Sequence, residues 1–226
     1  MSAFVRHPGD IYTLDAPLSF MGFKLGTRMT GVRLKDGSLF VHSPVPLDAA
    51  TRAELDALGP VAHVVAPSLF HHLHAGTMIE AYPKATLWAP RALRAKRKDL
   101  RIDHDLEDAA ASAPWRDELV PVAIEGTMLG ETVFVHPASR SGVSADLTEN
   151  VRTCDHLPTR LYLKAGGVYG RPGWNRLLRF VYRDKRAARR SVDRLLEHDF
   201  DRLYLAHGEI LETGAKPALV STFEFL

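Results

Sequence analysis

The sequence predicts a layered α/β domain, and three observations support this prediction. From residue 48 onward, apolar β-branched stretches alternate with segments of helical spacing, which is the order found in layered α/β domains. The residues before position 45 are instead rich in short strand-like stretches separated by Gly and Asp-Gly turn signals. A second group of strand-like stretches follows residue 118 and leads into an amphipathic helix, so two halves each contribute a sheet and helices.

Each expected element has a local signal. Asp48 is a fitting N-cap for a helix over residues 49–58, and Gly59 is its stop. The turn Lys35–Ser38 predicts a hairpin between strands over residues 29–34 and 39–42. Further strands are expected over residues 11–14, 61–66, 85–89, 119–124, 132–136, 142–147 and 203–206, and further helices over 75–82, 91–101 and 184–198.

Composition bounds the class of protein. A chain of 226 residues is long enough for one substantial core, so we expect a single domain over residues 1–226. The formal net charge of +2 recruits neither nucleic acid nor an acidic membrane, and no apolar stretch approaches the roughly 20 residues of a membrane span. The N-terminus lacks the apolar stretch of a signal peptide, so we expect a cytoplasmic protein without a membrane partner. The single cysteine, Cys154, excludes an internal disulfide and a cysteine-based zinc site.

Three histidines crowd the turn after the strand expected at residues 61–66: His71, His72 and His74. Ligand-bearing loops in α/β folds lie at the carboxyl ends of strands, and imidazole is the commonest side-chain metal ligand. A lone histidine after a strand is more often an ordinary polar loop residue. The turn is therefore a candidate site that needs partners elsewhere in the chain.

Ionisable residues follow three later strands. Asp146 ends one strand, and His207 ends the last one, where Gly208 frees the backbone to turn. His136 is a further candidate at the end of the strand expected over residues 132–136. Asp146 could instead cap the turn that follows it. The order of these residues along the chain indicates a site more strongly than any one of them.

That order resembles the metallo-β-lactamase-fold superfamily, in which an early hairpin, a histidine-rich turn, a strand ending in Asp-Leu and a last strand ending in His-Gly follow one another. The resemblance spans nearly the whole chain and is nearest to an uncharacterised, divergent branch. The segments that carry it are residues 28–30, 42–47, 66–67 with the nearby His-His pair, and 206–209. The resemblance implies an αββα sandwich of metallo-β-lactamase-like architecture.

The metal motifs of this chain are incomplete. The superfamily's first motif is His-x-His-x-Asp-His, and Ser68 and Phe70 stand near its first two histidines, while His71 and His72 approximate its Asp-His pair. No histidine stands near Gly126, where the superfamily has a Gly-His-Thr turn. The later motifs match. The resemblance therefore implies a reduced or rearranged site for one divalent ion, zinc first and iron or manganese as alternatives, with ligands drawn from His71, His72, His74, Asp146 and His207.

Two functions fit these residues. The first is a metal-dependent hydrolase of a small-molecule substrate, in which Asp146 ligates or orients water and His207 ligates or acts as acid and base. Glu209 and Asn150 are candidates to accept hydrogen bonds from the ligating imidazoles. The alternative is a non-catalytic ligand- or partner-binding protein on the same fold. The sequence names neither the substrate nor the oligomeric state.

Two other features of the sequence have an alternative interpretation. The basic stretches at residues 91–101 and 183–190 would suit nucleic-acid processing, but we expect them to be solvated helix faces, so no nucleic-acid partner is expected. The glycine-rich segment Lys164–Trp174 lacks the ending of a phosphate-binding loop. We expect a loop or lid there, with Tyr169 and Trp174 lining a substrate site.

Overall fold

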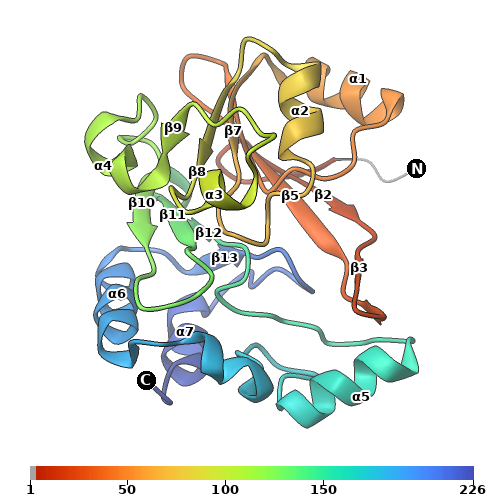
Figure 1. Ribbon diagram of the computed structural model, residues 1–226, viewed down its shortest axis with the longest axis vertical. Coiled ribbons are helices and arrows are strands. Elements are labelled where there is room, and N and C mark those ends of the chain that lie inside the picture. The colour runs from red at the N-terminus through yellow and green to blue at the C-terminus, as the bar shows by residue number, and fades with distance from the viewer. Residues whose placement is uncertain (1–3) are drawn as a thin grey trace.

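Two β-sheets lie face to face in the computed structural model, with helices on the outer side of each (Figure 1). Residues 4–226 are described. The first sheet has the strand order β1-β2-β5-β6-β7-β8-β9, and the second has the order β10-β11-β12-β13. None of the helices within residues 4–226 has the length and apolar character needed to cross a membrane.

The first sheet is antiparallel from β1 to β6 and parallel from β6 to β9. Its hairpin turn at Lys35–Ser38 is confirmed, as are the Asp48 cap and the stop of α1 at Gly59. Its strands are β1 (Val5–His7), β2 (Ile11–Ala16), β5 (Thr27–Arg33), β6 (Leu39–His42), β7 (Val61–Val65), β8 (Thr86–Ala89) and β9 (His104–Asp105). The helices of this half are α1 (Ala49–Leu58), α2 (Ala75–Ala81), α3 (Leu93–Lys96) and α4 (Ala109–Ser112), with the short 3-10 helix η1 (Leu106–Asp108).

The second sheet begins with two antiparallel pairs and ends with the parallel pair β12–β13. Its strands are β10 (Val120–Ala123), β11 (Thr132–His136), β12 (Ser141–Val143) and β13 (Arg202–Tyr204). The helices of this half are α5 (Leu157–Gly166), α6 (Lys185–Glu197) and α7 (Ala215–Thr222), with the 3-10 helices η2 (Pro137–Ser139) and η3 (Arg176–Val181). A separate two-stranded hairpin, β3 (Ser19–Phe20) with β4 (Phe23–Lys24), projects from the first sheet (Figure 1).

Alternation along the strands produces three apolar layers. Successive strand residues point to opposite faces, so Phe40 enters the layer between the sheets while Leu39 and Val41 pack toward the helices of the first half. In the second sheet, Phe134 enters the layer between the sheets and its neighbours pack toward α6 and α7. A helix layer on each side of two sheets is the αββα sandwich that the sequence predicts.

Two predicted elements are much shorter than expected, each for a local reason. The helix expected over residues 91–101 is reduced to α3, because Arg91 and Arg94 reach the carboxylate of Asp105 across the loop rather than pairing along a helix. The strand expected over residues 142–147 ends at Val143. Beyond it, the amides of Ala145 and Asp146 donate to a buried carboxylate instead of a neighbouring strand. Helix α5 and the β3–β4 hairpin lie outside the elements expected from sequence.

His42, at the end of β6, makes stability depend on pH. Its ring is 1% exposed, lies against Phe134 and has an Nε2 atom without a hydrogen-bond partner in residues 4–226. Burial lowers the pKa of His42 from 6.5 to about 3, so unfolding takes up a proton at any pH between these values. Stability is therefore lost as pH falls below 6.5, by about 1.4 kcal/mol per pH unit.

We expect His42→Leu to remove this dependence. Between pH 7 and pH 5, the wild type should lose about 2 kcal/mol more unfolding free energy than the variant, because only its unfolded state gains the imidazole proton. Urea unfolding at both pH values measures the difference. Parallel losses in the two proteins would contradict the assignment of His42 as a buried neutral imidazole.

Candidate metal centre

Three side chains from different strand ends converge at one edge of the sandwich. His71 follows β7 of the first sheet, whereas Asp146 and His207 follow β12 and β13 of the second. His71 Nε2 lies 3.2 Å from Asp146 Oδ1 and 3.2 Å from His207 Nε2, and His207 Nε2 lies 3.4 Å from the same carboxylate oxygen. Within residues 4–226, they form the one group of His, Cys, Asp and Glu side chains spaced to hold a metal ion.

A backbone carbonyl orients His207. Its Nδ1 atom lies 2.8 Å from the carbonyl oxygen of Gly26, which can only accept a hydrogen bond. The Nδ1 atom is therefore the donor, and the Nε2 lone pair of the neutral ring points toward His71 and Asp146. Glu209 and Asn150, the candidates that the sequence offers for this role, do not fill it. Glu209 is exposed, and the Asn150 side-chain amide donates to the Glu209 carbonyl instead.

A strained serine orients His71. Ser43 Oγ lies 2.8 Å from His71 Nδ1, and Ser43 has a φ of 54°, in the left-handed region that non-glycine residues rarely adopt. Its side chain is 2% exposed and follows the end of β6 directly. Strained backbone that persists at a strand end is typical of residues that hold a functional group in place.

Hydrogen bonds with Glu131 and Ser68 hold the loop that carries Asp146. The Glu131 carboxylate accepts hydrogen bonds from the Ala145 amide at 2.8 Å and the Asp146 amide at 3.0 Å. Ser68 Oγ donates to Asp146 Oδ2 at 3.4 Å and also accepts from the His71 amide at 3.1 Å. Ser68 therefore links the two loops.

Charges within the group shift several pKa values. Burial opposes ionisation of Asp146, but the charges and hydrogen bonds of His71 and His207 hold its pKa below the usual range. Burial lowers the pKa of His207, yet the Asp146 carboxylate more than offsets this effect and raises it. Glu131 is 2% exposed, and burial, with the Asp146 charge, raises its pKa to about 8.

The other candidate histidines lie outside this group. Arg97 donates to His72 Nδ1 at 3.1 Å, and burial with the charges of Lys96 and Arg97 lowers the pKa of His72 to about 4. His74 stands at the N-cap position of α2. His136 bonds to Ser139 Oγ at 2.7 Å.

The expected role of Trp174 at a substrate site is wrong. Its indole is 6% exposed and packs edge to face on Tyr182, within the apolar layer between the second sheet and its helices. The local sequence of a glycine-rich segment does not show whether its tryptophan is buried or exposed. In this chain, packing in the apolar layer beneath α6 and α7 buries Trp174.

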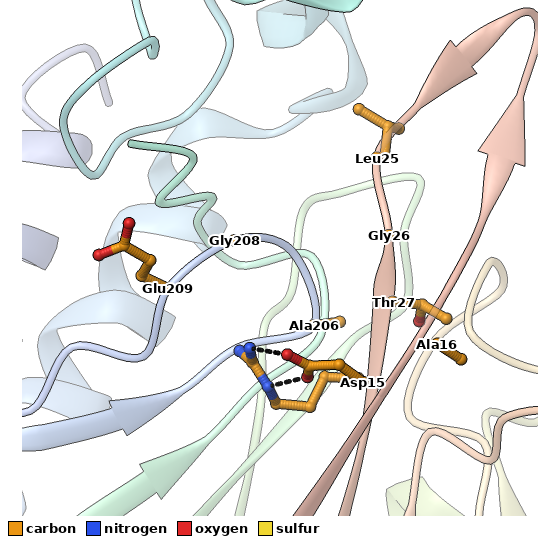
Figure 2. Close-up of a pocket in the computed structure, with 9 residues that line it drawn as sticks. Asp15, Ala16, Leu25, Gly26, Thr27, Ala206, Gly208 and Glu209 are labelled. Carbon is orange, nitrogen blue, oxygen red and sulfur yellow. Dashed lines mark hydrogen bonds and ion pairs between the residues drawn. The ribbon is translucent and has the colours of Figure 1, made fainter. Parts of the chain in front are cut away.

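Two adjoining cavities flank the His207 loop. They measure about 310 and 410 Å³ and share Leu25, Gly26 and Gly208 in their walls. Figure 2 shows the Gly208–Glu209 turn facing the segment Leu25–Thr27 across the smaller one. In the wall of the smaller cavity, Arg28 pairs with both carboxylate oxygens of Asp15 and donates to the Leu205 carbonyl, which joins the two sheets beside His207. The cavities adjoin this three-residue cluster through Gly26, but the clustered side chains do not line them.

The family model described as a domain of unknown function, DUF4336, matches residues 8–158. The chain belongs to this family. The matched residues include His71 and Asp146, whereas His207 lies beyond them. No sequence among curated proteins matches the chain.

Solved structures show which fold this DUF4336 chain adopts. It is similar to the DIM-1 metallo-β-lactamase, with a TM-score of 0.68 and 13% identity over 99% of this chain and 97% of that one. The metallo-β-lactamase from Pontibacter korlensis matches with a TM-score of 0.64 and 10% identity over 100% of both chains. The FIM-1 enzyme from Pseudomonas aeruginosa, solved in a mono-zinc form, matches with a TM-score of 0.66 and 11% identity over 99% of this chain and 95% of that one. The predicted metallo-β-lactamase fold is confirmed, and at such identities the likeness shows the fold alone.

Gly208 is expected to be essential for placing His207. It has a φ of +86°, and a Cβ atom there would collide with the carbonyl of Asn150. Gly208→Ala should therefore cost more than the ~1–2 kcal/mol of left-handed strain alone. Gly214→Ala is the matched control, because its φ is +72° and no atom lies within 4 Å of the added Cβ. Equal losses of unfolding free energy for the two variants in urea would contradict the tight packing of this turn.

Proposed function

We propose that His71, Asp146 and His207 hold one divalent metal ion, zinc first, and that the protein is a metal-dependent hydrolase acting on a small molecule. The supporting observation is the convergence of two imidazole nitrogens and one carboxylate oxygen at separations of 3.2, 3.2 and 3.4 Å. Ligand atoms bound tetrahedrally at 2.0–2.2 Å stand about 3.3–3.6 Å apart, so this triangle fits a zinc ion with little adjustment.

The number of ligands favours a catalytic rather than a purely structural centre. Structural zinc sites use four protein ligands, whereas catalytic sites use three and leave one position open. The mono-zinc form in which the similar FIM-1 enzyme was solved supports a one-ion centre on this fold. Imidazole and carboxylate also suit iron and manganese, so these ions belong in the same test.

Each ligand is prepared by its neighbours. Gly26 and Ser43 fix the outer nitrogens of the two rings, which leaves both Nε2 atoms directed inward. Asp146 is ionised near neutral pH because its pKa is low, and at 16% exposure its side chain is the most accessible of the three. A bound zinc ion supplies Lewis acidity, which lowers the pKa of water at its open position to near 7.

Both sheets supply ligands to the proposed metal centre. His71 comes from the first sheet, and the other two ligands come from the second, so neither half carries a complete centre. We therefore propose one functional domain over residues 1–226. Ser68 keeps the Asp146 carboxylate turned toward the other two ligands.

The metal centre is tested by ligand substitution with controls from the same turn. We expect the chelator-stripped wild type to bind one zinc ion per chain. His71→Ala, Asp146→Ala and His207→Ala should weaken binding more than about 100-fold, since even loss of a partner behind a ligand costs 10–100-fold. Titration calorimetry and elemental analysis measure affinity and content.

His72→Asn and His74→Ala are the matched controls and should leave zinc affinity unchanged. Hydrolysis of lactams, lactones, thioesters and phosphodiesters is measured with zinc, manganese and iron. Metal content far below one ion per chain, or equal losses in the control variants, would overturn the proposed centre. Binding without any turnover would leave the metal centre in place and contradict only the hydrolase.

Ser43 offers a second prediction in which affinity and stability move in opposite directions. Ser43→Gly removes the hydroxyl that holds His71, so zinc should bind about 10–100-fold more weakly. The same change relieves left-handed strain, so the metal-free protein should gain about 1 kcal/mol of unfolding free energy. Ser139→Gly is the control, because Ser139 holds His136 outside the cluster. A lower unfolding free energy of the metal-free Ser43→Gly variant, together with an unchanged affinity for zinc, would contradict the role of Ser43.

A further inference from the structure

Charge is strongly segregated along this chain. Residues 157–190 contain ten of the 29 Lys and Arg residues but one of the 27 Asp and Glu residues, so this segment has a formal net charge of +9 and the rest of the chain −7. The formal net charge of the whole chain is only +2, and the expectation of no membrane partner rests on that value. The value is the sum of these two opposite charges. The segment forms α5, η3 and the first half of α6.

These elements form one continuous end of the molecule. Arg176 of η3 donates to the Ala165 carbonyl of α5 at 2.7 Å, and Arg179 and Lys185 both lie over the ring of Phe225. Figure 1 shows α5 and the short helix after it along the lower end of the view, with the lower end of α6 beside them. The β3–β4 hairpin joins this end, because Phe23 stacks on Tyr162 of α5 with ring centroids 4.4 Å apart.

The basic side chains here lack acidic partners. Arg189 pairs with Asp193, but within residues 4–226 the other nine form no ion pair with a carboxylate. The one acid of the segment, Asp184, caps α6 by accepting from the Ala187 amide. The other basic stretch behaves differently, because Arg91, Arg94, Arg97 and Arg101 each pair with a nearby aspartate.

Apolar side chains stand exposed among these cations. Leu157 and Leu161 of α5 are 53% and 57% exposed, Leu177 and Phe180 of η3 are 51% and 59% exposed, and Met21 at the hairpin tip is 82% exposed. Cations above an apolar face are the composition of helices that lie in the interface of a lipid bilayer.

We propose that this basic–apolar surface, made of the β3–β4 hairpin tip, α5, η3 and the first turn of α6, docks on an anionic lipid bilayer. The cations meet the acidic headgroups, and the leucines, Phe180 and Met21 enter the boundary between headgroups and acyl chains. Nucleic acid would satisfy the cations but not the aliphatic side chains, and the aromatic rings needed for base stacking are few. The contact is peripheral and is independent of the proposed hydrolase activity.

Sedimentation of the full chain with lipid vesicles tests the proposal. We expect binding to vesicles of equal parts phosphatidylcholine and phosphatidylglycerol, weakened by salt, and little binding to phosphatidylcholine alone. The double variant Arg160→Glu with Lys164→Glu should lower the affinity for anionic vesicles at least about tenfold. Leu161→Ser with Phe180→Ser should also lower it, because the apolar contribution is lost.

Matched controls distinguish an effect of this surface from an effect of the protein's net charge. Lys84→Glu with Lys98→Glu changes the same charge at exposed positions elsewhere, and Val220→Ser removes an exposed apolar side chain from α7; both should bind like the wild type. Equal binding to neutral and anionic vesicles, equal loss in the controls, or no vesicle binding would overturn the proposal. Salt-dependent binding to duplex DNA or RNA without vesicle binding would assign the surface to nucleic acid instead and would also overturn it.

Discussion

The apolar layer between the two sheets is the constraint on which the candidate metal centre depends. Phe40 of the first sheet packs edge to face on Phe134 of the second at 5.2 Å, and Trp115 contacts both rings. This packing fixes how the sheets lie against each other, so the carboxyl ends of β7, β12 and β13 reach the same edge. Arg28 secures that edge by donating across to the Leu205 carbonyl. The site is therefore a product of the sandwich as a whole rather than of one loop.

A second consequence of this geometry is electrostatic. Asp146 and Glu131 are two neighbouring carboxylates in a buried region, and their pKa values shift in opposite directions. Burial raises the pKa of Glu131 to about 8, while the two imidazoles hold that of Asp146 low. A cluster with an ionised carboxylate between two rings attracts positive charge, so the Asp146 carboxylate raises the pKa of His207, and a metal ion would supply that charge in the proposed function. The imidazole Nε2 lone pair that would take up a proton is also the one that would bind the metal ion.

The sequence predicted most of the fold because local signals agreed with the global one. The Asp48 cap, the Asp-Gly hairpin and the alternating strands needed no long-range information. It also named the three clustered residues, together with His72 and His74, which share the same turn. No periodicity distinguishes neighbours in a turn, so only the packing of Arg97 on His72 separates them. The supporting roles of Ser43, Glu131 and Gly26 arise from contacts across 28, 15 and 181 positions of the chain, and no local pattern carries such information.

In the proposed centre, three side chains from two sheets hold one metal ion. A crystal structure of the zinc-loaded protein, with anomalous difference maps recorded on both sides of the zinc absorption edge, tests this most directly. We expect one anomalous peak bounded by His71 Nε2, His207 Nε2 and the Asp146 carboxylate, with His72 still bonded to Arg97. An anomalous peak on His72 or His74, or no peak in fully loaded crystals, would contradict it.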